Sequence, residues 1–215
     1  MTIKQKPADE VWAAFEREAK PTSRQLEQFQ QFITYMLECN QLFNLTAITD
    51  LPGVVRNHLL DSLALARFMD PQSITMMADI GTGAGFPAIP LKIMYPQLKI
   101  VLIEVTRKKQ EFLANVITML GLEDVEIYGL DWRTFLRTTE YPIDCFVTRA
   151  ALDDLELIRM FRPACRYNNA TLVYWASKHW EPHPKVKPFI TRIEPYRLGS
   201  KDRRLVFMSL QPAAK

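Results

Sequence analysis

The fold is decided by the stretch Asp79-Ile-Gly-Thr-Gly-Ala-Gly-Phe-Pro-Ala-Ile-Pro90, which holds three of the seven glycines in the 215-residue chain. An apolar run at residues 76–80 predicts a strand before the glycines, and residues 88–94 predict a helix after them. Glycine lets the backbone turn tightly and approach a ligand closely. Because open α/β sheets bind ligands where strands end, the stretch predicts a ligand-binding turn. A glycine-rich turn without a ligand is the alternative.

Outward from this stretch, short apolar runs alternate with amphipathic segments. This alternation is typical of a parallel sheet that is covered by helices on both faces. The predicted strands are residues 76–80, 100–104, 125–128, 145–148 and 171–175, the predicted helices are 88–94, 107–120 and 154–162, and a closing antiparallel hairpin is formed by 189–197 and 204–210. We therefore predict an α/β fold with a Rossmann-like, mostly parallel sheet.

The first third of the chain has a different pattern. Apolar residues between positions 8 and 69 recur at spacings of three and four, and none alternate with period two. Thr22 or Ser23 is expected to cap one of these helices. The sequence thus predicts a helical N-terminal extension at residues 1–70 and an α/β domain at residues 71–215, packed as one compact unit.

The composition is that of a folded protein, with 48% apolar and 24% charged residues. No uncharged stretch reaches the ~18 residues of a membrane span, and the N-terminus lacks the apolar core of a signal peptide. The three scattered cysteines exclude a disulfide framework and a CxxC metal site. Pro182 and Pro184 keep His179 and His183 from sharing a helical face, so we expect no metal. We expect a cytoplasmic protein without a membrane partner.

The charge of the chain is unevenly distributed. Its net charge is +3, but residues 1–78 carry a net −2, residues 79–150 a net −1 and residues 151–215 a net +6. A basic surface of this kind attracts a polyanion such as RNA. A solvated surface with a chance excess of arginine and lysine explains the pattern equally well.

The neighbours of the glycines indicate which ligand they bind. Glu104 ends the next predicted strand, where a carboxylate can accept both ribose hydroxyls of a nucleoside. Dinucleotide sites read GxGxxG, whereas this chain reads GxGxG and has Phe86 in the sixth position, which would crowd a pyrophosphate. Asp79 is a poor neighbour for phosphates and suits a cation. S-adenosylmethionine carries an ammonium and a sulfonium but no phosphate, so the pattern favours it over a nicotinamide cofactor.

Four segments resemble one known family in their order and spacing. They are Asn44-Leu-Thr-Ala-Ile-Thr49, His58-Leu-Leu-Asp-Ser-Leu63, Asp79 to Leu91, and Thr148-Arg-Ala150. The chain resembles the RsmG family, also called GidB, whose bacterial members methylate nitrogen 7 of a guanine in the 530 loop of small-subunit ribosomal RNA. This resemblance implies a seven-stranded class I methyltransferase fold with a helical N-terminal extension. It also implies rRNA processing as the role, and the small ribosomal subunit or its RNA as the partner of a monomer.

The resemblance also implies roles for particular residues. The residues expected to bind S-adenosylmethionine are Asp79, Gly81, Thr82, Gly83, Gly85, Phe86, Glu104, Asp131, Trp132 and Arg149. The residues expected near the reacting groups are Arg149, His58 and Asn44. The residues expected to contact RNA phosphates are Arg56, Lys108, Lys109, Arg203 and Arg204.

Several of these roles have a structural alternative that the sequence leaves open. Asp79 could order the loop instead of holding an ammonium, and Asp131 could be an exposed turn residue. Arg149 could lie on the surface past the end of a strand, and His58 could be a structural histidine. The basic residues expected to contact RNA could belong to a solvated face.

The chain departs from the family pattern at several positions. Ala88 stands where the family usually has glycine, Cys39 stands in place of tryptophan, and Asp131-Trp-Arg-Thr134 replaces Arg-Ala-Glu-Glu. Cofactor binding tolerates such changes more easily than substrate identity does. A methyltransferase with another substrate and a non-catalytic cofactor- or RNA-binding module are therefore alternatives. We expect no catalytic base, because nitrogen 7 has an in-plane lone pair and no proton.

Overall fold

The glycine stretch follows a strand that is buried along its whole length, as the sequence predicts. The computed structural model describes residues 7–149 and 152–210. The strand is β1 (Met76–Ile80), and α5 (Ala88–Met94) begins three residues after the last glycine. The outermost residues of the predicted extension and of the predicted α/β domain, 1–6 and 211–215, lie outside the described part of the chain.

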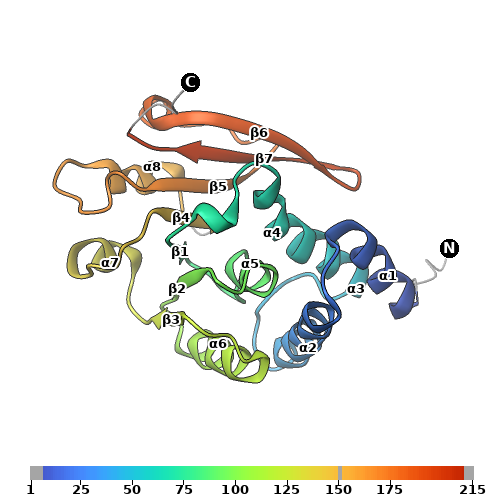
Figure 1. Ribbon diagram of the computed structural model, residues 1–215. Coiled ribbons are helices and arrows are strands. Elements are labelled where there is room, and N and C mark those ends of the chain that lie inside the picture. Colours follow the sequence, from blue (N-terminus) through green and yellow to red (C-terminus); the bar gives the residue numbers. More distant parts are fainter. Residues whose placement is uncertain (1–6, 150–151, 211–215) are drawn as a thin grey trace.

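Among the described residues, seven strands form one mixed sheet in the order β3-β2-β1-β4-β5-β7-β6 (Figure 1). The parallel strands are β1, β2 (Lys99–Ile103), β3 (Val125–Tyr128), β4 (Cys145–Arg149) and β5 (Thr171–Ser177). The hairpin of β6 (Ile190–Leu198) and β7 (Lys201–Met208) closes one edge, because β7 pairs antiparallel with β5. The α/β class and the mostly parallel sheet are confirmed, and the last strand starts at residue 201 rather than 204.

Successive residues of each strand face opposite layers of the core. Met77 and Ile100 pack into the first layer, whereas Ala78 and Val101 pack into the second. The first layer contains the N-terminal helices, α5 and α6 (Arg107–Leu120); the second contains α7 (Trp132–Thr138), α8 (Asp154–Leu157) and the 3-10 turn η4 (Ile158–Phe161). Because both faces are covered at the centre of the sheet, the central strands β1 and β4 are buried along almost their whole length.

The N-terminal extension begins with α1 (Ala8–Ala19) and α2 (Ser23–Asn40). Thr22 caps α2 through a capping box, in which its hydroxyl accepts from the backbone nitrogen of Gln25. Nε2 of Gln25 also donates to the carbonyl oxygens of Ile93 (2.9 Å) and Met94 (3.1 Å) in α5. The extension therefore shares hydrogen bonds and one apolar layer with the sheet. Within the described ranges, no helix is both long enough and apolar enough to cross a membrane.

Residues 51–67 are helical but irregular. The segment consists of α3 (Leu51–Val54), the π-helical η1 (Val55–Leu60), α4 (Asp61–Leu63) and the 3-10 helix η2 (Ala64–Arg67). Asp50 caps its start, because the Asp50 side chain accepts from the backbone nitrogen of Gly53. Two short 3-10 turns, η3 (Pro71–Ser73) and η5 (Lys187–Phe189), precede β1 and β6.

Two helices differ from the sequence prediction. The helix predicted at residues 154–162 is broken into α8 and η4. The helix α7 was not predicted, because seven residues are too few to show a clear helical period. Its start is set instead by Asp131, which caps the backbone nitrogens of Arg133 and Thr134.

The strand order places a topological switch point between β1 and β4. In open α/β sheets the ligand crevice lies outside the carboxyl ends of the strands at such a point. Glu104 follows β2, Asp131 follows β3 and Arg149 ends β4, so all three lie at the same edge as the glycines. Ala150, the last residue of the Thr148-Arg-Ala150 segment, lies outside the described residues.

Candidate functional site

Residues 81–85, here called the glycine loop, have a backbone that favours glycine at three positions. The φ angles are 66° at Gly81, 60° at Gly83 and 91° at Gly85. A Cβ on Gly85 would lie 2.5 Å from Cγ1 of Ile89, so α5 packs where no side chain fits. A Cβ on Gly83 would meet only the carbonyl oxygen of Gly81, at 3.9 Å. The loop is therefore closed toward α5 and open at Gly83.

Asp79 is fully buried next to this loop. Its Oδ2 accepts hydrogen bonds from Oγ1 of Thr82 (2.7 Å) and from the backbone nitrogen of Ala88 (3.2 Å). Its Oδ1 has no hydrogen-bond partner within the described residues. Burial raises the pKa of the carboxyl to about 7. Asp79 thus orders the loop through Oδ2, which agrees with the structural alternative that the sequence left open. Its Oδ1 remains without a donor among the described residues.

Glu104 is buried beside the open side of the loop. Its Oε2 accepts from the backbone nitrogen of Gly83 (3.1 Å), and its Oε1 accepts from the backbone nitrogen of Thr106 (2.8 Å). A carboxylate has about four lone-pair sites, so each oxygen keeps capacity for a further donor such as a ribose hydroxyl.

Two exposed apolar side chains stand at the same edge of the sheet and were missed by the sequence reasoning. Val105, directly after Glu104, is 61% exposed, and Leu130, directly before Asp131, is 57% exposed. Nε2 of Gln110 donates to the carbonyl oxygens of Glu104 (2.7 Å) and Gly129 (3.3 Å), which holds the two segments together. An apolar residue beside an acidic residue at a strand end is the signal that could have identified them.

Asp131 and Trp132 occupy the start of α7. The Asp131 side chain is exposed and caps the helix, and hydrogen bonds from Thr134 lower its pKa. This geometry agrees with the turn role that the sequence left open for Asp131. Trp132 is buried, and within the described residues its Nε1 has no hydrogen-bond partner.

Arg149 is the central contact between β4 and the N-terminal extension. Its side chain is only 13% exposed, so the surface alternative is wrong. Its Nη1 donates to the carbonyl oxygen of Asn57 (3.0 Å) and to Oδ2 of Asp61 (3.3 Å). Its Nη2 lies 3.1 Å from Nδ1 of His58, and its Cζ lies 5.3 Å from the centre of the Phe86 ring. Arg149 therefore joins three segments around the glycine loop.

His58 supports Arg149 and stacks on Phe86, with 4.6 Å between the ring centres. Because a guanidinium only donates, Nδ1 of His58 is the acceptor, and Nε2–H donates to Oγ1 of Thr46 (2.7 Å). Burial and the charge of Arg149 lower the pKa of His58 to about 4, so the ring is neutral at neutral pH. Both ring nitrogens are used inside the protein, which gives His58 a supporting position rather than contact with a reacting group.

Asp61, which sequence reasoning did not select, is the centre of this network. The residue is 1% exposed and accepts hydrogen bonds from Arg149, from Arg203 Nη2 (2.9 Å) and from the hydroxyl of Tyr196 (2.6 Å). Nε1 of Trp175 donates to its carbonyl oxygen (2.9 Å). A carboxylate three residues after His58 on an apolar helix was the available signal.

Two of the residues predicted to contact RNA, Arg203 and Arg204, have hydrogen-bond partners inside the fold. Arg203 donates two hydrogen bonds to Asp61, a carboxylate that it shares with Arg149. Nη1 of Arg204 donates to the carbonyl oxygen of Trp180 (3.4 Å), and its side chain is half-buried. Arg203 and Arg204 are neighbours in β7, so their side chains leave opposite faces of the sheet and meet partners from distant segments, which local sequence does not reveal.

The remaining predicted residues lie at or near the surface. Arg56 and Lys108 are exposed, whereas Lys109 is half-buried. Asn44, which was expected near the reacting groups, is exposed on the segment between α2 and α3. The structure thus brings Arg149, His58 and Phe86 together and leaves Asn44 outside their hydrogen bonds.

The acceptor oxygens around the glycine loop fit a cationic nucleoside-like molecule. Oδ1 of Asp79 is a buried oxygen without a donor, Gly83 borders open space, and Glu104 can accept hydroxyls. The exposed Val105 and Leu130 offer apolar surface for a flat ring. Within residues 7–149 and 152–210, no group of three histidine, cysteine, aspartate or glutamate side chains could hold a metal ion.

Comparison with known proteins agrees with this architecture. The family model of GidB, described as rRNA small subunit methyltransferase G, matches residues 25–188. A Geobacillus sp. protein named Ribosomal RNA small subunit methyltransferase G is 35% identical over 74% of this chain and 68% of its own length. The protein of that name from Geobacillus kaustophilus is 42% identical over 54% of this chain and 49% of its own length.

The matched segment spans about half the length of several of these relatives. Among solved structures, a SAM dependent methyltransferase from Aquifex aeolicus superimposes with a TM-score of 0.51 at 16% identity. The superposition covers 73% of this chain and 93% of that one. At this identity the likeness shows the fold, which is the Rossmann-like class I methyltransferase fold.

Proposed function

We propose, from the premise that this chain belongs to the GidB family of rRNA small subunit methyltransferase G proteins, that it methylates nitrogen 7 of a guanine in the 530 loop of small-subunit ribosomal RNA. The methyl donor is S-adenosylmethionine. The observation that carries the proposal is that the family match, residues 25–188, contains both the glycine loop and the network of His58, Asp61 and Arg149.

The glycine loop supplies the binding site for the methyl donor. The free Oδ1 of Asp79 holds the ammonium, directly or through a water, and the open side at Gly83 admits the methionine chain. Glu104 accepts the ribose hydroxyls, and Val105 and Leu130 cover the adenine. S-adenosylmethionine supplies a methyl group on a sulfonium, which is a good electrophile without further activation.

The side chains around the loop match a reaction that needs no base. Guanine nitrogen 7 carries an in-plane lone pair and no proton, so positioning and exclusion of water are sufficient for transfer. His58 is neutral and has both nitrogens engaged, and the guanidinium of Arg149 is held by Asp61. These residues therefore orient the walls of the cleft and move no proton.

Arg149 acts as a positioning residue in this proposal. The Arg149 guanidinium holds η1 of the extension against Phe86, so the extension packs directly on the end of the glycine loop. The target base is expected to leave its stack and enter between these walls, as in other enzymes that modify nucleobases.

The test is transfer of labelled methyl from S-adenosylmethionine to small ribosomal subunits purified from a strain without its own enzyme. Cleavage at nitrogen-7-methylguanine then maps the modified position. We expect one cleavage site, in the 530 loop. Cofactor binding without any transfer would move the function to another substrate or to a non-catalytic role, and a cleavage elsewhere would overturn the proposed target.

A further inference from the structure

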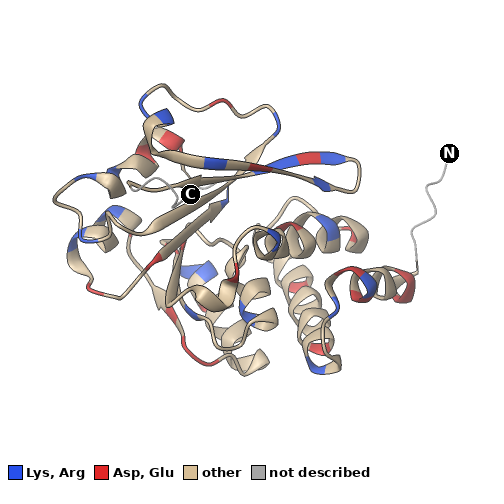
Figure 2. Ribbon diagram, turned by 45° about the horizontal axis from the view of Figure 1, so that its top comes forward, with Lys and Arg blue, Asp and Glu red and all other residues tan. Residues whose placement is uncertain are grey.

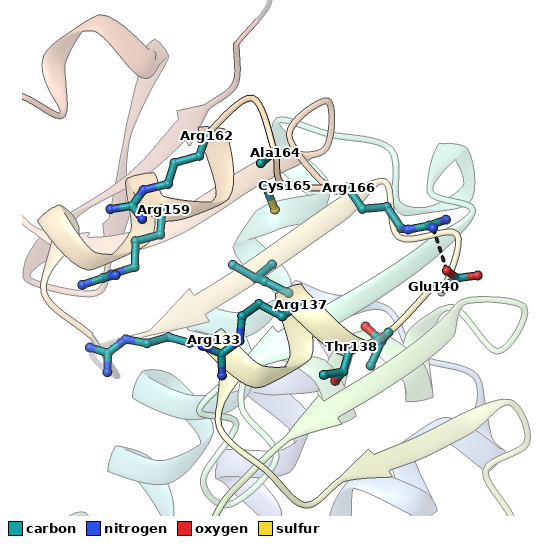
Figure 3. Close-up of a pocket in the computed structure, with 11 residues that line it drawn as sticks. Arg133, Arg137, Thr138, Glu140, Arg159, Arg162, Ala164, Cys165 and Arg166 are labelled. Carbon is teal, nitrogen blue, oxygen red and sulfur yellow. Dashed lines mark hydrogen bonds and ion pairs between the residues drawn. The ribbon is translucent and has the colours of Figure 1, made fainter.

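A cavity lies on the sheet face opposite the N-terminal helices (Figure 3). It has a volume of about 470 Å³ and lies between α7, η4 and residues 162–166. Its walls carry five arginines, Arg133, Arg137, Arg159, Arg162 and Arg166. We call it the arginine pocket. Figure 3 shows Arg133 and Arg137 on one helix, and Arg159 and Arg162 on the segment facing it.

The positive charge of the arginine pocket is only partly compensated. Arg133 and Arg159 share one carboxylate, Glu156, at 2.6 and 2.7 Å, and their hydrogen bonds lower its pKa to about 2. Arg166 pairs with Glu140 at 2.6 Å. Neither of the other two arginines, Arg137 and Arg162, makes an ion pair with a described residue. The pocket thus holds more positive than negative charge, and an anion would relieve the repulsion between the guanidinium groups.

A second basic hollow, near β7, has fewer unpaired cations than the arginine pocket. It is lined by Lys178, Arg197 and Arg203 among others. Lys178 and Arg197 both pair with Asp202, and Arg203 pairs with Asp61. Arg204 also lines this hollow and makes no ion pair with a described residue, so the hollow keeps one unpaired arginine where the arginine pocket keeps two. Figure 2 shows Lys and Arg (blue) on the helix and loop segments at the left, the side on which Figure 1 places α7 and α8.

The arginine pocket begins beside the candidate cofactor site. Asp131 follows β3 at the carboxyl edge of the sheet, and Arg133 lies two residues further on in α7. Arg137 is one helical turn beyond Arg133, and the pocket continues from there to residues 162–166. A chain of phosphates that left the cofactor cleft along α7 would therefore pass directly over these guanidinium groups.

We propose that the arginine pocket binds phosphates of the RNA strand that flanks the target guanine. This inference rests on the proposed function and names a substrate contact outside the cofactor cleft. Guanidinium groups bind phosphate oxygens through paired hydrogen bonds, and several arginines in a row track a backbone without reading its sequence. Arg159, Arg162 and Arg166 belong to residues 151–215, so the arginine pocket gives part of the excess positive charge of that segment a role in RNA binding.

The first test compares two double variants that each lose two positive charges. Arg137→Gln with Arg162→Gln removes the unpaired arginines of the pocket, whereas Arg17→Gln with Arg24→Gln removes exposed arginines from α1 and α2. The pocket variant should raise the KM for small ribosomal subunits about tenfold and reduce the slope of log KM against log salt by about 1.5, with kcat unchanged. The control variant should leave KM within about twofold.

Equal KM values for the two variants would overturn the proposal. Failure of the proposed function has a different result, because the wild-type protein itself would then transfer no methyl to the subunits. Thermal unfolding of each variant, within a few degrees of wild type, confirms that both fold.

The second test uses Cys165 as a probe in the pocket wall. Cys165 is partly exposed, while Cys39 and Cys145 are buried and serve as internal controls. Small ribosomal subunits should slow alkylation of Cys165 by iodoacetamide at least fivefold, and inorganic phosphate at the same phosphate concentration should not. No protection by the subunits, or equal protection by inorganic phosphate, would contradict binding of the RNA backbone.

Discussion

Two buried carboxylates, Asp61 and Asp79, lie on the same layer of this protein and have opposite surroundings. Asp61 accepts from two arginines and a tyrosine, so both of its oxygens are occupied. Asp79 accepts only through Oδ2, and its Oδ1 has no partner among the described residues. Burial of an oxygen without a donor is costly, and it raises the pKa of Asp79 to about 7.

The difference separates a carboxylate that holds the fold together from the one that we propose binds the cofactor. Asp61 is neutralised by its own protein and ties the extension to β4, β6 and β7. Asp79 is left with a buried oxygen that a cationic ligand would satisfy. Substitution of Asp61 should therefore lower the free energy of unfolding, whereas substitution of Asp79 should lower the affinity for the cofactor.

The largest effect is expected from Asp61→Asn. The change leaves Arg149 and Arg203 without their shared counter-charge, and loss of one partner of a buried ion pair costs about 3 kcal/mol. Urea unfolding measures this loss, together with a fall in methyl transfer. The control is Asp154→Asn, which removes a buried carboxylate that accepts a hydrogen bond from the backbone nitrogen of His183, and it should cost about 1 kcal/mol. An equal loss in both variants would contradict the central role of Asp61.

Gly83→Asp should lower the affinity for S-adenosylmethionine at least about 100-fold. This corresponds to a loss of about 2.7 kcal/mol of binding free energy. The new carboxylate would enter the open side of the loop and add negative charge between Asp79 and Glu104. Gly121→Asp is a matched control, because Gly121 has φ 61° and its Cβ would meet nothing within 4 Å. Calorimetry measures both affinities, and unchanged binding by Gly83→Asp would refute the placement of the cofactor.

Arg149→Lys keeps the charge but loses the planar guanidinium that contacts Asn57, His58 and Asp61. Misplacement of the cleft walls should lower kcat about 100-fold while the affinity for S-adenosylmethionine changes less than about threefold. Arg192→Lys, which loses a stacking contact on Phe207 outside the cleft, should keep kcat. A parallel loss of cofactor affinity and stability, with kcat intact, would mean that Arg149 is only structural.

The smallest expected effect is a pH dependence of cofactor affinity. Because the pKa of Asp79 is about 7, the carboxyl is protonated below that value and cannot hold an ammonium. Affinity should therefore rise as pH increases from about 5.5 to about 7, by up to tenfold per unit. The same raised pKa stabilises the fold at low pH, and this contribution is lost as pH rises from about 4 through 7. Affinity that is flat over this range would show that Asp79 does not titrate on binding.

Local patterns in the sequence were sufficient for the sheet and the glycine loop. The strands are apolar on both faces, and the glycines stand where the chain turns back on α5, so short-range spacing contains the information. The resemblance to the RsmG family supplied the strand count, and two of the residues that it selected for catalysis, Arg149 and His58, lie in contact with each other.

Contacts between distant segments could not be predicted in the same way. Asp61 and Arg203 are 142 positions apart and meet only because β7 pairs with β5 across the sheet. The sequence therefore predicted Arg203 as a surface charge, although its guanidinium pairs with the buried Asp61. The five arginines of the pocket belong to two segments of the chain, so no run of basic residues marked them.

The most direct test of the account is calorimetric titration of Asp79→Asn with S-adenosylmethionine, combined with urea unfolding of the same variant. Asparagine keeps the shape of the side chain and removes the buried charge. We predict an affinity at least about tenfold weaker than wild type at pH 7.5, with a stability equal to or above that of wild type. Wild-type affinity in this variant would contradict the assignment of Asp79 as the residue that holds the cofactor.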